Sequence, residues 1–101
     1  MHIHMPQQSG LQKCISGRRY HRGDVLIVDD DRFVQCVACV KVEDGHESAA
    51  GLLVNEAIKR KGTWKVMCDL QDQTQFLVLS HHRLRFASVF KQEAQRLYVI
   101  L

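Results

Sequence analysis

Two apolar runs that flank three consecutive aspartates constrain the fold more than any other feature of the sequence. Residues 25–28 read VLIV and residues 32–42 read RFVQCVACVKV, with Asp29, Asp30 and Asp31 between them. β-branched residues favour strands, and an acidic tripeptide between two such runs favours a turn. The sequence therefore predicts a β-hairpin over these residues.

The second run also predicts which side of this hairpin is buried. Side chains alternate between the two faces of a strand, so residues two positions apart share a face. One face carries only small or medium apolar residues: Val34, Cys36, Ala38, Val40 and Val42. We expect this face to line the core.

Residues 48–61 have the spacing of an amphipathic helix. Ser48 is a suitable N-cap, and Gly62 follows the segment as a helix stop. Apolar residues recur three, four, seven and eight positions apart, at Ala50, Leu53, Val54, Ala57 and Ile58. The pattern predicts a helix between two β-rich segments.

The C-terminal third predicts a second hairpin and a second helix. The apolar runs TWKVMCDL and TQFLVLS flank a short polar stretch, which is typical of two strands around a turn. Near residues 88–100 a helical stripe is formed by Phe90, Ala94, Leu97, Tyr98 and Leu101.

The order of these elements predicts a mainly β fold of the α+β class. Short strands with open edges aggregate, and closure into a small bent barrel removes the edges at this chain length. We therefore expect one barrel domain over residues 18–101, with a helical insertion and a C-terminal helix, after a mobile tail at residues 1–17. A small α+β sandwich is the alternative.

Composition sets the broad class of protein and excludes little else. The chain has 101 residues, 46% of them hydrophobic and 25% charged, as in one ordinary globular domain. The net charge of +3, from 14 Lys and Arg against 11 Asp and Glu, is too small to indicate nucleic-acid binding by itself. No segment has the pattern of a secretory signal or a membrane span, so we expect an intracellular protein without membrane contact.

Cysteines and histidines provide the weak candidates for metal binding and catalysis. Cys36 and Cys39 are three residues apart, so in a continuous strand their sulfur atoms point to opposite faces. A bulged strand would bring them together, and Cys68 with His81 or His82 would then complete a zinc site. The alternative is that the cysteines are buried thiols in a reducing compartment. No spacing in the chain is typical of a catalytic triad, and we expect no enzyme, no bound metal and no cofactor.

Basic residues occur in three clusters that a compact fold could gather on one side. The clusters are Arg18, Arg19 and Arg22, then Lys59, Arg60 and Lys61, and finally Arg83 and Arg85. A shared patch would bind phosphates, with Tyr20 and Trp64 available for base stacking. The alternative is that these are scattered solubilising charges, balanced by nearby acidic residues.

Several aromatic residues lie near the expected ends of strands, namely Tyr20, Phe33, Trp64 and Phe76. Aromatic faces around one point hold a methylated or quaternary ammonium group by cation–π attraction. Packing in the core or at the mouth of the barrel is the alternative for each of these side chains.

Taken together, the two predicted hairpins resemble the Tudor and chromo-barrel modules of the SH3-like barrel group. The residues that carry this resemblance are Gly23 and Asp24 before the first apolar run, the turn Asp29 to Asp31, Phe33, the segment Val66 to Asp72, Phe76, and Leu84 with Arg85. They cover less than half of the chain.

The resemblance implies an SH3-like barrel whose mouth holds methylated lysine or arginine. It would put Phe33 and Phe76 at that mouth, with Asp72 as the nearby acidic group for a cationic ligand. Trp64 or Tyr20 would complete the aromatic cage.

Three functions agree with the sequence. The first is non-enzymatic recognition of a protein in chromatin, such as a methylated histone tail, which would place the chain in the nucleus rather than the cytoplasm. The second is binding to the nucleic-acid backbone through the basic clusters. The third is a small zinc-stabilised or homodimeric interaction protein whose last helix forms the interface.

Overall fold

The fold consists almost entirely of antiparallel β-structure. The computed structural model describes residues 2–4, 12–13, 19–44 and 47–101, and within these ranges the helical structure is one 3₁₀ turn, η1 (Leu79–His81). The expected α+β class, with helices near residues 48–61 and 88–100, is therefore wrong. Most of the expected mobile tail at residues 1–17 lies outside the described ranges.

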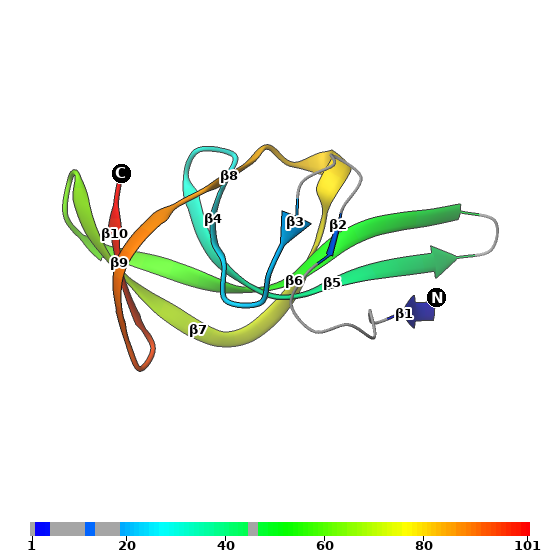
Figure 1. The fold of residues 1–101 in the computed structure, drawn as a ribbon, viewed down its shortest axis with the longest axis horizontal. Coiled ribbons are helices and arrows are strands. Elements are labelled where there is room, and N and C mark those ends of the chain that lie inside the picture. The colour runs from blue at the N-terminus through cyan, green and yellow to red at the C-terminus, as the bar shows by residue number, and fades with distance from the viewer. Residues whose placement is uncertain (1, 5–11, 14–18, 45–46) are drawn as a thin grey trace.

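One large sheet contains most of the strands. Its order is β8-β4-β5-β6-β7-β10-β9, with β1 also paired to β5, and β2 and β3 form a separate pair. Figure 1 shows β5, β6 and β7 as long, curved ribbons, with the β9–β10 hairpin near one end of the molecule. The strand bounds are β1 His2–His4, β2 Gln12–Lys13, β3 Arg19–Tyr20, β4 Val25–Val28, β5 Arg32–Asp44, β6 Glu47–Lys61, β7 Lys65–Val78, β8 Leu84–Phe86, β9 Ser88–Glu93 and β10 Arg96–Ile100.

The first predicted hairpin is confirmed. β4 and β5 pair antiparallel, with Val28 opposite Arg32. Asp29 and Asp30 have φ values of 52° and 65°, and the Asp31 amide donates to the Val28 carbonyl at 3.2 Å. Aspartate tolerates this left-handed conformation because its short polar side chain bonds to nearby backbone groups, so the acidic tripeptide makes the turn.

The segment predicted as the first helix is the central strand β6. Leu52 and Val54 are fully buried and Leu53 between them is not, which is the two-residue period of a strand. Leu52 lies opposite Cys39 of β5 on one side and Leu77 of β7 on the other. Residues 47–61 form a strand because β5 and β7 both pair with them through backbone hydrogen bonds. This tertiary pairing overrides the weak helical propensity of the segment.

The second predicted helix is also wrong, for the same physical reason. Leu97 and Val99 of β10 are fully buried, whereas Tyr98 between them is only half-buried. Ala94, with φ of 50°, lies in the turn that reverses the chain between β9 and β10. The apolar spacing that suggested a helix arises from two strands read in sequence across this turn.

The second predicted hairpin is one continuous strand. β7 runs through the polar stretch, where Leu70 pairs with Ala57 and Thr74 with Asn55 of β6. Residues 71–73 therefore oppose the single residue Glu56, and the polar stretch is a bulge rather than a turn.

The sheet is open, so the expected closed SH3-like barrel is wrong. Within the described ranges β8 and β9 end the main strand order, although Ala87 alone separates them along the chain, and β1 is a further edge strand beside β5. The sheet covers two cores instead of wrapping around one. The Tyr20 core contains Tyr20, Leu26, Val28, Val34, Cys36, Cys39, Leu52, Val54, Leu77 and Leu79. The Phe33 core contains Val25, Ile27, Phe33, Ala57, Val66, Cys68, Leu97 and Val99.

Strand β4 contributes to both cores. Leu26 and Val28 enter the Tyr20 core, and Val25 and Ile27 enter the Phe33 core. An apolar strand without alternation, VLIV, is typical of a strand that is covered on both faces. β4 is therefore packed on both of its faces.

Candidate functional site

The aromatic side chains expected to form a cage do not meet at one point. Tyr20 is 2% exposed and Phe33 is 6% exposed, and they belong to different cores. Phe76 is half-buried on β7, and Trp64 is 62% exposed in the turn between β6 and β7. Asp72 lies exposed in the β7 bulge.

The basic residues that were expected to share one patch lie in separate places in the structure. Arg83 and Arg85 lie beside Asp30, at 3.5 Å and 3.6 Å from its carboxylate. Lys59, Arg60 and Lys61 end β6, on the way to the β6–β7 turn. The expected single patch is divided between these places, with Arg22 exposed before β4. Arg18 and the side chain of Arg19 lie outside the described part of the chain.

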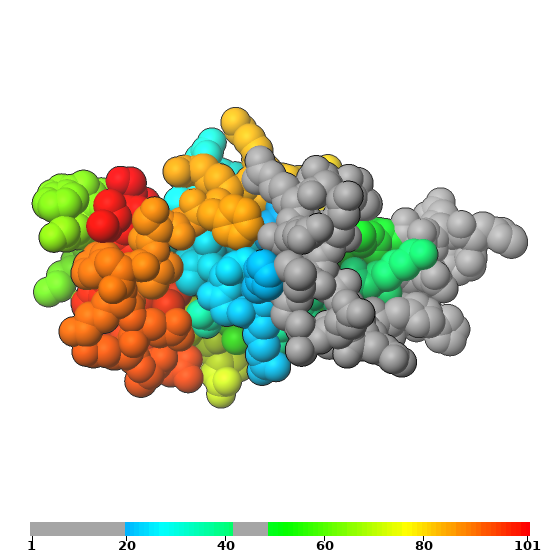
Figure 2. All heavy atoms as spheres, in the orientation of Figure 1, coloured from blue at the N-terminus to red at the C-terminus, as the bar shows by residue number. Residues whose placement is uncertain are grey.

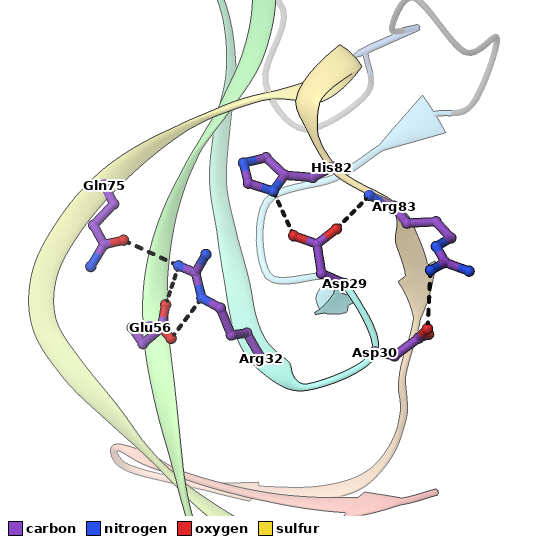
Figure 3. Close-up of polar contacts among 7 residues, drawn as sticks. All are labelled: Asp29, Asp30, Arg32, Glu56, Gln75, His82 and Arg83. Carbon is purple, nitrogen blue, oxygen red and sulfur yellow. Dashed lines mark hydrogen bonds and ion pairs between the residues drawn. The ribbon is translucent and has the colours of Figure 1, made fainter.

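The acidic turn is hydrogen-bonded to the segment that precedes β8. Asp29 accepts a hydrogen bond from the Arg83 amide at 2.9 Å and lies 2.8 Å from the His82 ring, as Figure 3 shows. The bond from the Arg83 amide, followed by that from His82, lowers the pKa of Asp29 below its usual value. This carboxylate ties the β4–β5 turn to the segment before β8.

The guanidinium group of Arg32 is also paired with a carboxylate. Arg32 donates two hydrogen bonds to the Glu56 carboxylate, at 3.1 Å and 2.8 Å, and a third to Gln75 at 3.3 Å. The bond to Glu56 raises the pKa of Arg32. A bidentate pair of this kind fixes β5 against β6 and leaves little charge for a ligand.

A different surface, formed by β6, β7, β10 and β9, carries exposed aromatic and basic side chains together. We call it the C-terminal outer face. On β10, Leu97 and Val99 point into the Phe33 core, so Tyr98 points outward. The register places Tyr98 between Met67 of β7 and Lys91 of β9. The outward residues of the face include Ile58, Arg60, Lys61, Trp64, Lys65, Met67, Asp69, Phe90, Lys91, Glu93, Arg96, Tyr98 and Ile100.

The aromatic rings of this face lie close to its lysines. The Lys65 ammonium group lies 4.8 Å from the Trp64 ring centroid and 5.8 Å from that of Phe90. Phe90, which is 51% exposed, lies 6.0 Å from the Tyr98 ring, and Lys91 lies 5.6 Å over Tyr98. In Figure 2 the C-terminal hairpin and the β6–β7 turn adjoin at one end of the molecule, in agreement with a 2.8 Å bond from the Leu101 amide to the Trp64 carbonyl.

Cations outnumber carboxylates on the C-terminal outer face. Asp69 accepts hydrogen bonds from the Nε atoms of Arg60 at 2.8 Å and of Arg96 at 2.9 Å. These bonds, the one from Arg96 first, lower the pKa of Asp69, and the same contact raises that of Arg96. Glu93 pairs with Lys91 at 2.8 Å. Asp69 therefore fixes two guanidinium groups side by side, while Lys61 and Lys65 are exposed at the turn.

The three cysteines that the structure describes, Cys36, Cys39 and Cys68, are buried in the two cores. A bulge between Cys36 and Ala38 turns Cys39 to the same side as Cys36, and both enter the Tyr20 core. Cys68 lies in the Phe33 core, where burial raises the pKa of its thiol. Within the part of the chain that the structure describes, no three His, Cys, Asp or Glu side chains are grouped to hold a metal ion.

Sequence reasoning missed much of the C-terminal outer face. Phe90, Tyr98, Lys91 and Arg96 were placed on an expected helix, where their grouping with Trp64 could not be recognised. The signal was the alternation in RLYVI, residues 96–100, which puts Leu97 and Val99 on one face and their neighbours on the other.

Comparison with known proteins gave no assignment. No protein-family model matches the chain, and no curated protein and no solved structure matches it either. Among the described residues, no helix is both long enough and apolar enough to span a membrane.

Proposed function

We propose that the chain is a non-enzymatic module that binds nucleic acid through the C-terminal outer face. The observation that carries this proposal is the interleaving of exposed aromatic rings with cations, represented by Lys65 between Trp64 and Phe90. Phosphates are bound by lysine and arginine, and bases stack on exposed aromatic rings, so a surface with both suits a nucleic-acid strand.

The distribution of charge supports this surface over the other basic clusters. Around the acidic turn, Arg83 and Arg85 lie beside the Asp30 carboxylate, and Arg32 forms an ion pair with Glu56. On the C-terminal outer face five cations face two carboxylates, as its membership above shows. The excess of positive charge is therefore local, which the net charge of the chain does not reveal.

Recognition of a methylated lysine or arginine by Phe33, Trp64 and Phe76 has less support. Phe33 is part of a core, and Phe76 is half-buried near the end of β7. Trp64 lies in the β6–β7 turn, at the opposite end of β7 from Phe76. A cationic ligand on the C-terminal outer face would also be repelled by the lysines around the rings.

Paired alanine variants test the proposal. We expect K61A/K65A to weaken binding to a labelled oligonucleotide about fivefold or more at low salt, because two exposed phosphate contacts are lost. The control R83A/R85A removes the same charge beside Asp30 and is expected to change affinity less than about twofold. Fluorescence anisotropy of the labelled strand measures both.

Three results would contradict the proposal. The first is an equal loss in both double variants, which would mean that net charge alone attracts the strand. The second is displacement of the oligonucleotide by polyglutamate at the same concentration of charge, which would assign the face to an acidic protein partner. The third is a homodimer in sedimentation that W64A dissociates, which would assign the face to a second copy of the chain.

A further inference from the structure

Two exposed rings on the C-terminal outer face flank the same point in space. The Lys65 ammonium group lies within cation–π range of both Trp64 and Phe90, at 4.8 Å and 5.8 Å from their ring centroids. The two rings belong to different segments, the β6–β7 turn and β9, so the fold brings them together. Because their exposed fractions are 62% and 51%, a ligand can cover both.

We infer that Trp64 and Phe90 take an unpaired nucleobase, so that the ligand of this face is a single strand rather than a duplex. This inference rests on the proposed function and names its substrate class. A base stacks favourably on an exposed aromatic ring, and only unpaired bases offer a free face.

The charges around the rings favour a base over a cationic ligand. Lys65 lies over both rings, Lys91 lies over the neighbouring ring of Tyr98, and Lys61 is exposed just before the turn that holds Trp64. The nearby carboxylates are engaged, since Asp69 binds two arginines and Glu93 binds Lys91. A strand supplies an uncharged aromatic base for the rings and phosphates for the lysines, so its chemistry matches both parts of the site.

Lys65 has a separate role in this arrangement. Its ammonium group now covers the rings, and a base that enters between them displaces it toward the adjacent phosphate. The polar group that the structure places over both rings is the Lys65 ammonium group, which is carried on a flexible stem and presents donors only. Stacking at this site is therefore expected to tolerate any base.

The experiment compares three probes of equal phosphate number: a mixed-sequence single strand, a strand of abasic deoxyribose phosphates, and a duplex. Trp64 is the only tryptophan of the chain, so its fluorescence reports on stacking directly. We expect the single strand to quench Trp64 and to bind about fivefold or more tightly than the abasic strand or the duplex.

The variants W64A and W64F complete the test. Trp64 is exposed, so neither change is expected to disturb folding, which circular dichroism verifies. W64A should lower affinity for the single strand to the level of the abasic strand, leave abasic binding unchanged, and differ from W64F, which keeps a ring.

The outcomes separate the inference from the function on which it rests. Equal binding of all three probes without quenching of Trp64 would overturn the stacking site and leave phosphate binding by the face intact. A loss of abasic binding in W64A would also overturn it, because the tryptophan would then act through Lys65. No binding of any probe would end the proposed function together with the inference.

Discussion

Gly51 is a residue at which two of the long strands, β6 and β7, pack closely. A Cβ atom added at Gly51 of β6 would collide with the Phe76 ring and with the Leu77 carbonyl, both on β7. The ring of Phe76 therefore occupies the space that a side chain on β6 would fill. This contact uses Phe76 for packing, which agrees with its absence from any aromatic cage.

We expect G51A to destabilise the fold by roughly 1–3 kcal/mol, because the added methyl group forces the two strands apart. Urea denaturation measures the change in the free energy of unfolding. The double variant G51A/F76L should recover part of the loss, since a flexible leucine relieves the collision with the ring. A G51A protein as stable as the parent would show that β6 and β7 are not in this register.

Asp29 makes the stability of the folded chain depend on pH, in a direction that follows from its hydrogen bonds. Its pKa is lowered in the folded chain by the Arg83 amide and His82, so its contribution to stability is present above its pKa in the unfolded chain. That contribution is lost as the pH falls through the lowered folded pKa.

Compared with the parent, D29N should be less stable at about pH 5, and the difference should disappear toward about pH 2. Asparagine keeps the left-handed turn, so the comparison isolates the carboxylate. The measurement is thermal unfolding of both proteins across this range. A constant difference at every pH would contradict the assigned hydrogen bonds of Asp29.

At the scale of elements, the sequence predicted the β4–β5 hairpin and the extended conformation of β7, and it failed at β6 and at the β9–β10 hairpin for one reason. The turn chemistry of Asp29 to Asp31 is local, so it can be recognised without knowing what packs on it. β6 and β10 are strands because their neighbours pair with them, and Leu52 and Leu97 owe their burial to residues distant in the sequence. An apolar residue every three or four positions suits a helix and, across a bulge or turn, also suits two faces of strands.

The C-terminal outer face could not be recognised from the sequence because residues 88–100 were predicted to be a helix. Trp64 and Lys61 were recognised as candidates and Lys65 was not, and Phe90 and Tyr98 join them only when residues 88–100 form a hairpin on β7. The expected aromatic partners Tyr20 and Phe33 were instead used by the two cores.

In a strand, substitutions at neighbouring residues of β10 should have different effects, one mainly on stability and the other mainly on binding. L97A removes a fully buried side chain of the Phe33 core and should cost roughly 2–4 kcal/mol of stability with unchanged affinity of the folded protein for a single strand. Y98A should cost less than half as much and lower that affinity about fivefold, because Tyr98 faces outward. Denaturation curves and anisotropy measure the pair, and similar losses of stability in both variants would contradict the strand.

For the whole molecule, the two cores divide the surface into regions of different charge. The β4–β5 turn and β8 combine their arginines with Asp29 and Asp30, whereas the hairpin beyond the Phe33 core carries lysines beside exposed rings. A polyanion approaching the molecule is therefore attracted to one end of it, and the aromatic residues lie at that same end.

Backbone amide chemical shifts during titration with an unlabelled single strand test the central claim most directly. We predict that the shifts that change gather at residues 60–69 of the β6–β7 turn and at residues 88–100 of the β9–β10 hairpin. Amides around Arg83, Arg85 and the β4–β5 turn should remain unchanged. Changes centred on Phe33, Phe76 and Asp72, or on the β8 arginines, with the C-terminal outer face unaffected, would contradict the account.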